Sequence, residues 1–315
     1  MKHIVSNFLC LLLALLFLPW AAPAALAAKK TPEIPEELLE EGQEEALREW
    51  CAAKFEGSEV SDPAEIPWPE NRLEDGYLPE GAAEFIYDDA EKGLWGYLSS
   101  SLQVQIVKHQ IPEVPHLWYE AEVIFKPDQE AFTQHIYVNA SFKNQEIYPE
   151  TLAQTSKLVF AVNGDYHKSR VEKKLPIGNI IRHGEVLYTH PVNRSMKFPN
   201  LDTLAIHSDG SFSVSAGKEY SAEELLAQGD VTDALSFGPY LVRDGVMRVY
   251  DGDSAEVPEP RMAYGMISPG HLYFVMVEGK MPKKGEQGFD LWLLADSTSG
   301  PLTPKWVNSI SPKSS

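Results

Sequence analysis

Four chemically capable residues and a glycine follow a short apolar run near the middle of the chain. Directly after the run 159–162 stand a carboxamide, a glycine, a carboxylate, a phenol and an imidazole: Asn163, Gly164, Asp165, Tyr166 and His167. Short apolar runs are typical of buried strands, and Asn-Gly favours a sharp turn. The pattern therefore predicts either polar groups for acid–base chemistry at the exit of a strand, or a plain hairpin turn in which the tyrosine caps the core.

Four later segments also place polar groups at the ends of expected strands. Arg182 and His183 follow two isoleucines, and Gly238 lies in a Ser-Phe-Gly-Pro sequence where the backbone can approach another segment closely. Arg261 begins one apolar strand, and Glu278 ends the next. An arginine beside a buried run usually meets a carboxylate or a bound anion. An internal ion pair between Arg261 and Glu278 is the alternative.

Several common catalytic signatures are missing from the sequence. It contains no Gly-rich phosphate loop, no Gly-x-Ser-x-Gly elbow, no His-Glu-x-x-His and no cysteine cluster. Asp251–Ser254 is similar to part of a calcium loop but lacks the later ligands, so we interpret it as a turn. The sequence assigns no metal ligands and requires no cofactor, although it leaves open whether the protein binds a divalent cation.

The elements that would position these groups are mostly strands. Alternating patterns predict strands over 102–107 and 118–125, and Asp-Gly at 209–210 and 244–245 predicts two hairpins. Helices are expected over 149–157 and after a capping box formed by Ser221 and Glu224. The predicted fold is one α+β, strand-dominated domain with short helices over 94–315.

An acidic, proline-rich arm is expected before that domain. Residues 1–27 have the basic start, short apolar stretch and Ala-x-Ala end of a signal peptide, with an uncleaved membrane anchor as the alternative. Residues 28–93 predict an amphipathic helix and an extended linker, which could still pack on the domain through Trp68, Tyr77 and Phe85. Cleavage would leave Cys51 as the only cysteine, which excludes an intrachain disulfide.

The charge of the chain limits its partners. A formal net charge of −19 argues against a basic face that binds nucleic acid or anionic membrane. With the leader removed, we expect no stable membrane insertion. The expected product is secreted or held in the cell envelope.

Taken in order, four of these segments resemble the phosphodiester glycosidase family. They are the turn 163–166, the turn 181–184, the stretch 236–239 with its following Asp-Gly, and the stretch 261–265 followed by 277–280. The resemblance covers about 94–296. It implies an exported hydrolase that cleaves a sugar–phosphodiester linkage in an envelope or exopolysaccharide glycan.

The sequence departs from the family pattern at three places. Glu278-Gly279-Lys280 stands where the family usually has Asp-Gly-Arg, and Met262 stands where it has threonine. After about residue 296 the expected Asp-Gly-Gly turn is absent, as in a truncated domain. Loss of a core strand there predicts an open sheet edge. The alternatives are therefore a catalytically impaired or non-catalytic glycan-binding envelope protein, and a chain that does not fold stably.

The resemblance and the expected strand ends together suggest a role for each candidate. Asp165 and Glu278 would act as acid and base, Arg261 would bind the phosphate, and Asn163 with Tyr166 would orient the sugar. The remaining candidates would line the substrate site: Gly164, Arg182, His183 and Gly238. The side chains expected to make the pocket positive are Arg261, Arg182, Lys280 and Lys168.

Overall fold

The computed structural model describes residue 46 and residues 59–111, 116–127, 149–165, 178–189, 201–217, 219–243, 246–247, 259–279 and 306–310. All of them belong to one compact unit, Ile34–Ser315. Several predicted features lie outside the described residues: the signal peptide, Tyr166, Lys168, Lys280 and the calcium-like turn. The predicted helix of the N-terminal arm also lies outside them, except for residue 46. Within the described part of the chain, no helix has the length and hydropathy needed to span a membrane.

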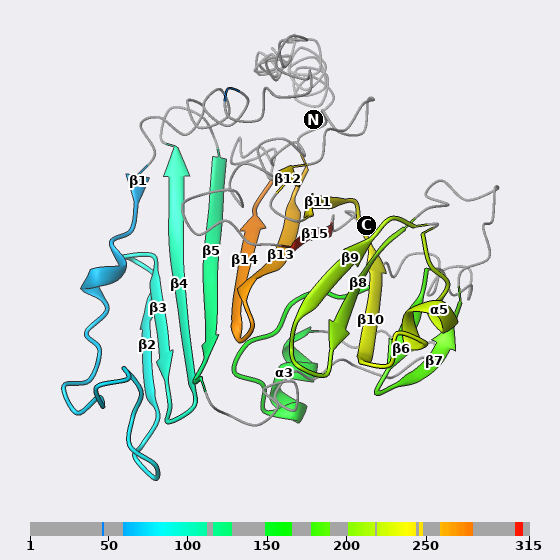
Figure 1. Ribbon diagram of the computed structural model, residues 1–315. Coiled ribbons are helices and arrows are strands. Elements are labelled where there is room, and N and C mark those ends of the chain that lie inside the picture. Colours follow the sequence, from blue (N-terminus) through cyan, green and yellow to red (C-terminus); the bar gives the residue numbers. More distant parts are fainter. Residues whose placement is uncertain are drawn as a thin grey trace, which may run out of the picture. The chain divides into compact units, whose positions relative to one another are not determined.

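The described residues form two antiparallel sheets with few short helices, which confirms the strand-dominated architecture (Figure 1). The large sheet has the order β12-β11-β15-β13-β14-β5-β4-β3-β2, with β1 paired to β4. Its strands are β1 (Glu59–Val60), β2 (Phe85–Asp89), β3 (Leu94–Leu98), β4 (Leu102–Ile111), β5 (His116–Phe125), β11 (Tyr240–Arg243), β12 (Val246–Met247), β13 (Arg261–Ser268), β14 (His271–Val277) and β15 (Trp306–Ile310).

The small sheet has the order β7-β6-β10-β8-β9. Its strands are β6 (Ile180–Arg182), β7 (Glu185–Tyr188), β8 (Asp202–His207), β9 (Phe212–Ser215) and β10 (Val231–Phe237). The helical elements are η3 (Pro63–Glu65), α3 (Pro149–Ser156) and α5 (Ala222–Leu226).

The main core lies between the small sheet and one face of the large sheet, which we call the inner face. Val104, Val123 and Phe274 from the large sheet pack in one cluster with Leu204 and Phe212 from the small sheet. Cross-strand partners share a face of a sheet, so every residue paired in register with these large-sheet residues also belongs to the inner face.

Local sequence signals are confirmed where the structure describes them. The helix expected over 149–157 is α3, and Ser221 and Glu224 form the predicted capping box at the start of α5. β8 and β9 pair on either side of Asp209-Gly210, and β11 pairs with β12 as the second Asp-Gly predicted. These features are determined by residues only a few positions apart, which explains why the sequence predicts them well.

The strand predicted over residues 159–162 is wrong. The structure has no strand there, and the side chains of Val159 and Val162 are 47% and 39% exposed. Only Phe160 reaches the core, where its ring lies 4.7 Å from that of Phe274. An apolar run becomes a strand only when a neighbouring strand takes up its backbone hydrogen bonds, and this run lacks one in the described chain.

Residues 59–92 do not form the extended linker that their prolines suggested. β1 pairs with β4, β2 pairs with β3, and Ile66, Tyr77 and Leu78 are only 3%, 5% and 2% exposed. The alternative contacts through Trp68, Tyr77 and Phe85 are confirmed, because these residues pack in clusters on the large sheet. This segment covers part of the outer face, opposite the inner one.

The open edge predicted at the C-terminal end of the domain is also not observed. β15 lies between β13 and β11, with Ala263 opposite Ser309 and Val242 opposite Val307. Residues after position 296 therefore supply an interior strand, although their sequence does not contain the expected Asp-Gly-Gly turn.

Candidate functional site

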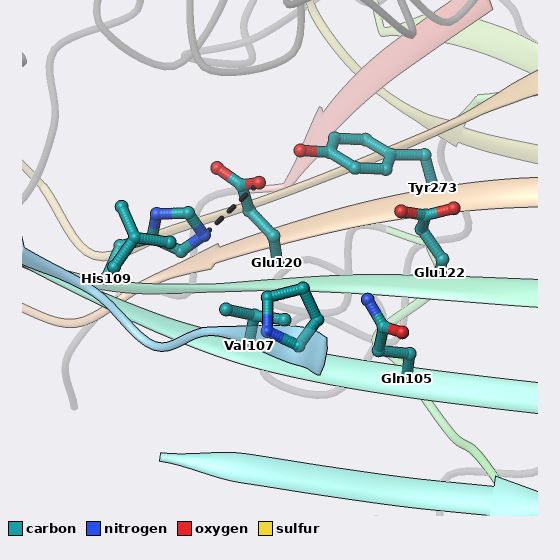
Figure 2. Close-up of a pocket in the computed structure, with 8 residues that line it drawn as sticks. Gln105, Val107, His109, Glu120, Glu122 and Tyr273 are labelled. Atoms are coloured by element: carbon teal, nitrogen blue, oxygen red, sulfur yellow. Dashed lines mark ion pairs between the residues drawn. The ribbon is translucent and has the colours of Figure 1, made fainter. Parts of the chain in front are cut away.

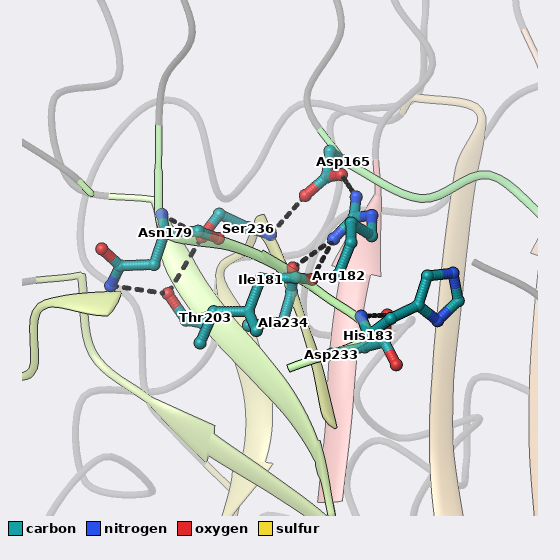
Figure 3. A network of polar contacts seen from close by, with 9 residues as sticks. All are labelled: Asp165, Asn179, Ile181, Arg182, His183, Thr203, Asp233, Ala234 and Ser236. Carbon is teal, nitrogen blue, oxygen red and sulfur yellow. Dashed lines mark hydrogen bonds and ion pairs between the residues drawn. The ribbon is translucent and has the colours of Figure 1, made fainter. Parts of the chain in front are cut away.

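The most strongly constrained of the predicted site residues is the buried pair Asp165–Arg182 (Figure 3). Their side chains are 4% and 5% exposed and form an ion pair through Asp165 Oδ2 and Arg182 Nη2. Asp165 Oδ1 accepts a hydrogen bond of 2.7 Å from the backbone N–H of Ser236, and Arg182 Nη1 donates to the carbonyl of Ala234 at 2.6 Å. The pair thus joins the loop after α3 to β6 and β10.

A buried polar network lies beside this pair and ties three strands of the small sheet together. The Ser236 hydroxyl donates to the carbonyl of Asn179 at 3.0 Å, accepts from the Asn179 N–H at 2.8 Å and lies 3.0 Å from the Thr203 hydroxyl. The Asn179 side chain donates to the carbonyl of Tyr220 at 2.8 Å. Gly178 makes the close approach possible, since a Cβ there would lie 2.2 Å from Ser236 Cβ.

Gly238 occupies the corner at which the chain leaves the small sheet for the large one. β10 ends at Phe237 and β11 begins at Tyr240, so only two residues connect the sheets. Gly238 has φ +79°, and a Cβ there would lie 2.8 Å from Asp202 Cβ. The Asp202 carboxylate accepts from the Tyr240 N–H at 3.0 Å, which anchors the corner. The predicted close backbone approach at Gly238 is confirmed.

Arg261 and Glu278 lie at the same end of two neighbouring strands. Arg261, which is 6% exposed, is the first residue of β13 and pairs in register with Val277, the residue before Glu278. Glu278 is half-buried; its N–H donates to the carbonyl of Leu117 at 3.0 Å, and its Oε1 accepts from the Tyr119 hydroxyl at 3.3 Å. A buried cation and a partly accessible carboxylate thus lie at the same end of β13 and β14, with Arg261 on the face of Val277 and Glu278 on the face of Tyr119.

Tyr264 on β13 connects this strand to the Asp165–Arg182 pair. Burial is the main reason that the pKa of its hydroxyl is raised; the negative charge of Asp165 adds to the rise, while Arg182 opposes it. The hydroxyl is buried and has no hydrogen-bond partner among the described residues. The electrostatic influence of both charges indicates that the Tyr264 hydroxyl lies near the Asp165–Arg182 pair.

The remaining predicted residues are less constrained. Asn163 is exposed, and Gly164 lies close to Leu235, where a Cβ would be 3.4 Å from its Cδ2. His183 has φ +51° and an exposed side chain, and its backbone N–H donates to Asp233 at 3.2 Å. Sequence reasoning missed Asn179, Thr203, Asp202 and Ser236, although Gly178 and Gly238 were the available signals of close packing beside them.

A separate pocket of about 200 Å³ opens on the outer face of the large sheet (Figure 2). Glu120 and Glu122 alternate on β5 and so share this face with His109 and Tyr273. Glu120 accepts from the Trp118 indole at 3.0 Å and lies 3.3 Å from His109 Nε2. Glu122 lies 2.7 Å from His271 Nε2.

Two opposing effects set the pKa of Glu120. Burial raises it most, but the interactions with His109, Tyr273 and Trp118 together outweigh burial, so its pKa is below the usual value. The alternating Glu120-x-Glu122 pattern was the sequence signal for this pocket. Within the described ranges, no group of three His, Cys, Asp or Glu residues is arranged to hold a metal ion.

Comparison with known proteins identifies one family. Residues 156–298 match the model of the family described as phosphodiester glycosidase, which confirms the resemblance read from the sequence. None of the curated proteins compared with the chain matches it significantly.

Two solved structures are similar to this chain at low sequence identity. A hypothetical protein from Synechocystis has a TM-score of 0.42 and 9% identity, covering 74% of this chain, which spans 58% of that protein. The catalytic domain of zebrafish N-acetylglucosamine-1-phosphodiester alpha-N-acetylglucosaminidase, auto-inhibited by its pro-peptide, has a TM-score of 0.40 and 18% identity. That match covers 85% of this chain and 80% of the zebrafish one.

Proposed function

We propose that this protein is an exported hydrolase that cleaves sugar–phosphodiester linkages in an envelope or exopolysaccharide glycan. Residues 156–298 match the phosphodiester glycosidase family, which indicates a glycosidase-type hydrolase. One observation carries the proposal: within the matched segment, the candidate residues Arg261 and Glu278 lie at the same end of the paired strands β13 and β14. The leader-like residues 1–27 support export.

In the proposed reaction, water adds to the anomeric carbon and the bond from that carbon to the phosphate oxygen breaks. The products are the free sugar and a phosphate monoester, whose leaving oxygen takes up a proton. Glu278 is the candidate proton donor, because it is partly accessible and has one long hydrogen bond from Tyr119. Arg261 supplies positive charge for the phosphate, which an acidic chain must concentrate locally.

Asp165 has a different environment from Glu278. Both of its oxygens accept hydrogen bonds or ion-pair contacts, from Ser236 and Arg182. This arrangement favours a positioning role for Asp165, which fixes Arg182 and the corner beside Ser236. Its predicted part in acid–base chemistry stays a prediction, as do the parts of Asn163, Gly164, Tyr166, His183 and Gly238 in binding the sugar.

Activity on a panel of hexose-1-phosphate methyl diesters tests the proposal. We expect wild-type turnover, a fall in kcat of at least about 100-fold in Glu278→Gln, and a raised KM in Arg261→Ala. Glu219→Gln is a matched control, because Glu219 pairs with Arg243 on an exposed surface. Turnover of Glu278→Gln at the wild-type rate would remove Glu278 from its role.

The same assay separates the alternative function. Binding of the diesters without hydrolysis by a cooperatively unfolding wild-type protein would favour the non-catalytic glycan-binding protein. If the wild-type protein shows no cooperative thermal transition, the result would instead support the alternative that the chain does not fold stably.

A further inference from the structure

The inner face of the large sheet carries exposed apolar side chains next to Glu278. Ile86 on β2 is 73% exposed and Met276 on β14 is 43% exposed, while Trp95 and Tyr119 between them are partly exposed. Register places all four on the inner face, since Ile86 pairs with Tyr97, Trp95 with Ile106, and Tyr119 with Met276. We call Ile86, Trp95, Tyr119 and Met276 the aromatic strip.

The two rings of the strip form one continuous surface. Trp95 on β3 and Tyr119 on β5 are separated by β4, yet their ring centroids are only 5.8 Å apart. Because strands lie about 4.8 Å apart, the rings must lean toward each other over β4. Lys108 on β4 pairs with Tyr119 in register and adds a positive charge at this position.

Tyr119 also connects the strip to the candidate catalytic carboxylate. Its hydroxyl donates to Glu278 Oε1 at 3.3 Å, so the phenol ring lies directly beside the candidate proton donor. From β14 to β3 the strip crosses three strand spacings, about 14 Å. That length exceeds what a single sugar ring needs.

The chemistry of the strip fits a glycan. One face of a pyranose ring presents C–H groups and packs against an aromatic ring, while its hydroxyls stay hydrated at the edges. A nearby lysine complements a phosphate in the same glycan. Three of the four members of the strip lie outside the segment matched by the family model, since β2, β3 and β5 precede residue 156, whereas Met276 lies within it.

We propose that the aromatic strip is a glycan-binding surface that holds sugar units beyond the bond cleaved at Glu278. The preferred substrate is then a phosphate-containing oligosaccharide or polymer rather than a single sugar phosphodiester. This inference rests on the proposed function, because that function makes Glu278 the point of cleavage.

Binding as a function of chain length tests the proposal separately from hydrolysis. The probes are oligomers of N-acetylglucosamine-1-phosphate with one, three and five units, measured by calorimetry on the full chain carrying Glu278→Gln. We expect the affinity to rise at least about tenfold from one unit to five. Adding Trp95→Ala should remove most of that gain, whereas Trp95→Phe, which keeps a ring, should retain it.

Tyr220→Ala is the matched control, since Tyr220 is a tyrosine with 39% exposure that lies outside the strip. It should leave the length dependence intact. An affinity that does not change with length, no binding of any oligomer, or full length dependence in a folded Trp95→Ala variant would overturn the proposal. Absence of turnover in the wild-type protein would instead count against the proposed function, because the calorimetric measurement does not depend on hydrolysis.

Discussion

Asp165 and Arg182 were selected from the sequence as candidate site residues, but in the structure they form a buried ion pair that stabilises the fold. Each charged group is almost fully removed from water and lies against the other. Burying a charge is costly unless a partner and further hydrogen bonds compensate, and here Ser236 and Ala234 supply those bonds. Removal of one partner would leave the other charge buried and uncompensated.

We therefore expect Arg182→Met to lower the free energy of unfolding by about 3–5 kcal/mol, measured by urea denaturation. Arg243→Ala breaks an ion pair with Glu219 on the surface and should cost about 1 kcal/mol or less. Equal effects of the two substitutions would contradict the assignment of the Asp165–Arg182 pair as a buried structural anchor.

Glu120 predicts a dependence of stability on pH. Its folded pKa lies below the reference value of 4.5, so its ionised form stabilises the fold above that pH. This contribution should be lost as the pH falls from about 4.5 through the lower folded pKa. Glu120→Gln should flatten the fall in melting temperature over this acidic range, as followed by circular dichroism. A variant with the wild-type acid profile would exclude Glu120 as a source of the effect.

At the scale of elements, the corner between β10 and β11 determines how the two sheets join. Gly238 adopts a positive φ and lies against Asp202, whose carboxylate accepts a hydrogen bond from the first residue of β11. A side chain at this position would both strain the backbone and push Asp202 away from Tyr240.

Gly238→Ala should consequently destabilise the protein more than Gly184→Ala. Gly184 also has a positive φ of +76°, but a Cβ there would contact nothing within 4 Å. We expect about 1 kcal/mol for Gly184→Ala from backbone strain alone, and at least about 1 kcal/mol more for Gly238→Ala. Thermal unfolding of both variants measures the difference, and equal losses would show that the contact with Asp202 relaxes freely.

The range of each interaction explains which elements could be predicted. The capping box at Ser221 and the Asp-Gly hairpins depend on residues close in sequence, and they formed where expected. The run 159–162 looked like a strand, but pairing depends on a distant partner, which residue types alone do not reveal. Likewise, the prolines after residue 60 obscured the buried side chains of Ile66, Tyr77 and Leu78.

The candidate site follows the same rule. The sequence predicted polar groups at strand ends, and Arg261 and Glu278 lie at the same end of β13 and β14. It suggested that Arg261 and Arg182 pair with anions without identifying Asp165 as the partner of Arg182, because that contact joins a loop to β6. The aromatic strip depends on the register of β3, β4 and β5, which alternation indicates only strand by strand.

For the whole molecule, β15 is the strand that links the parts of the large sheet. It pairs with β13 on one side and with β11 on the other. Through the Gly238 corner, β11 continues from the small sheet. The last described residues of the chain thereby complete a path of backbone hydrogen bonds from β14 to β12.

Deletion of residues 301–315 should therefore destabilise the entire unit. The deletion removes β15 and leaves unpaired backbone groups on both β11 and β13. We expect a lower melting temperature and faster amide hydrogen exchange in β11 and β13 than in β4 and β5, measured by mass spectrometry. Unchanged exchange in β11 and β13 would show that β15 does not pair with them in solution.

The other end of the large sheet has a consequence for self-association. Among the described strands, β2 is the last in the order, and its outer backbone groups could template a second copy of the chain. Its sequence ends in Asp88 and Asp89. Parallel addition of a second β2 would bring these carboxylates together, and antiparallel addition would place them against Phe85 and Ile86. The strand thus carries its own barrier to fibril growth.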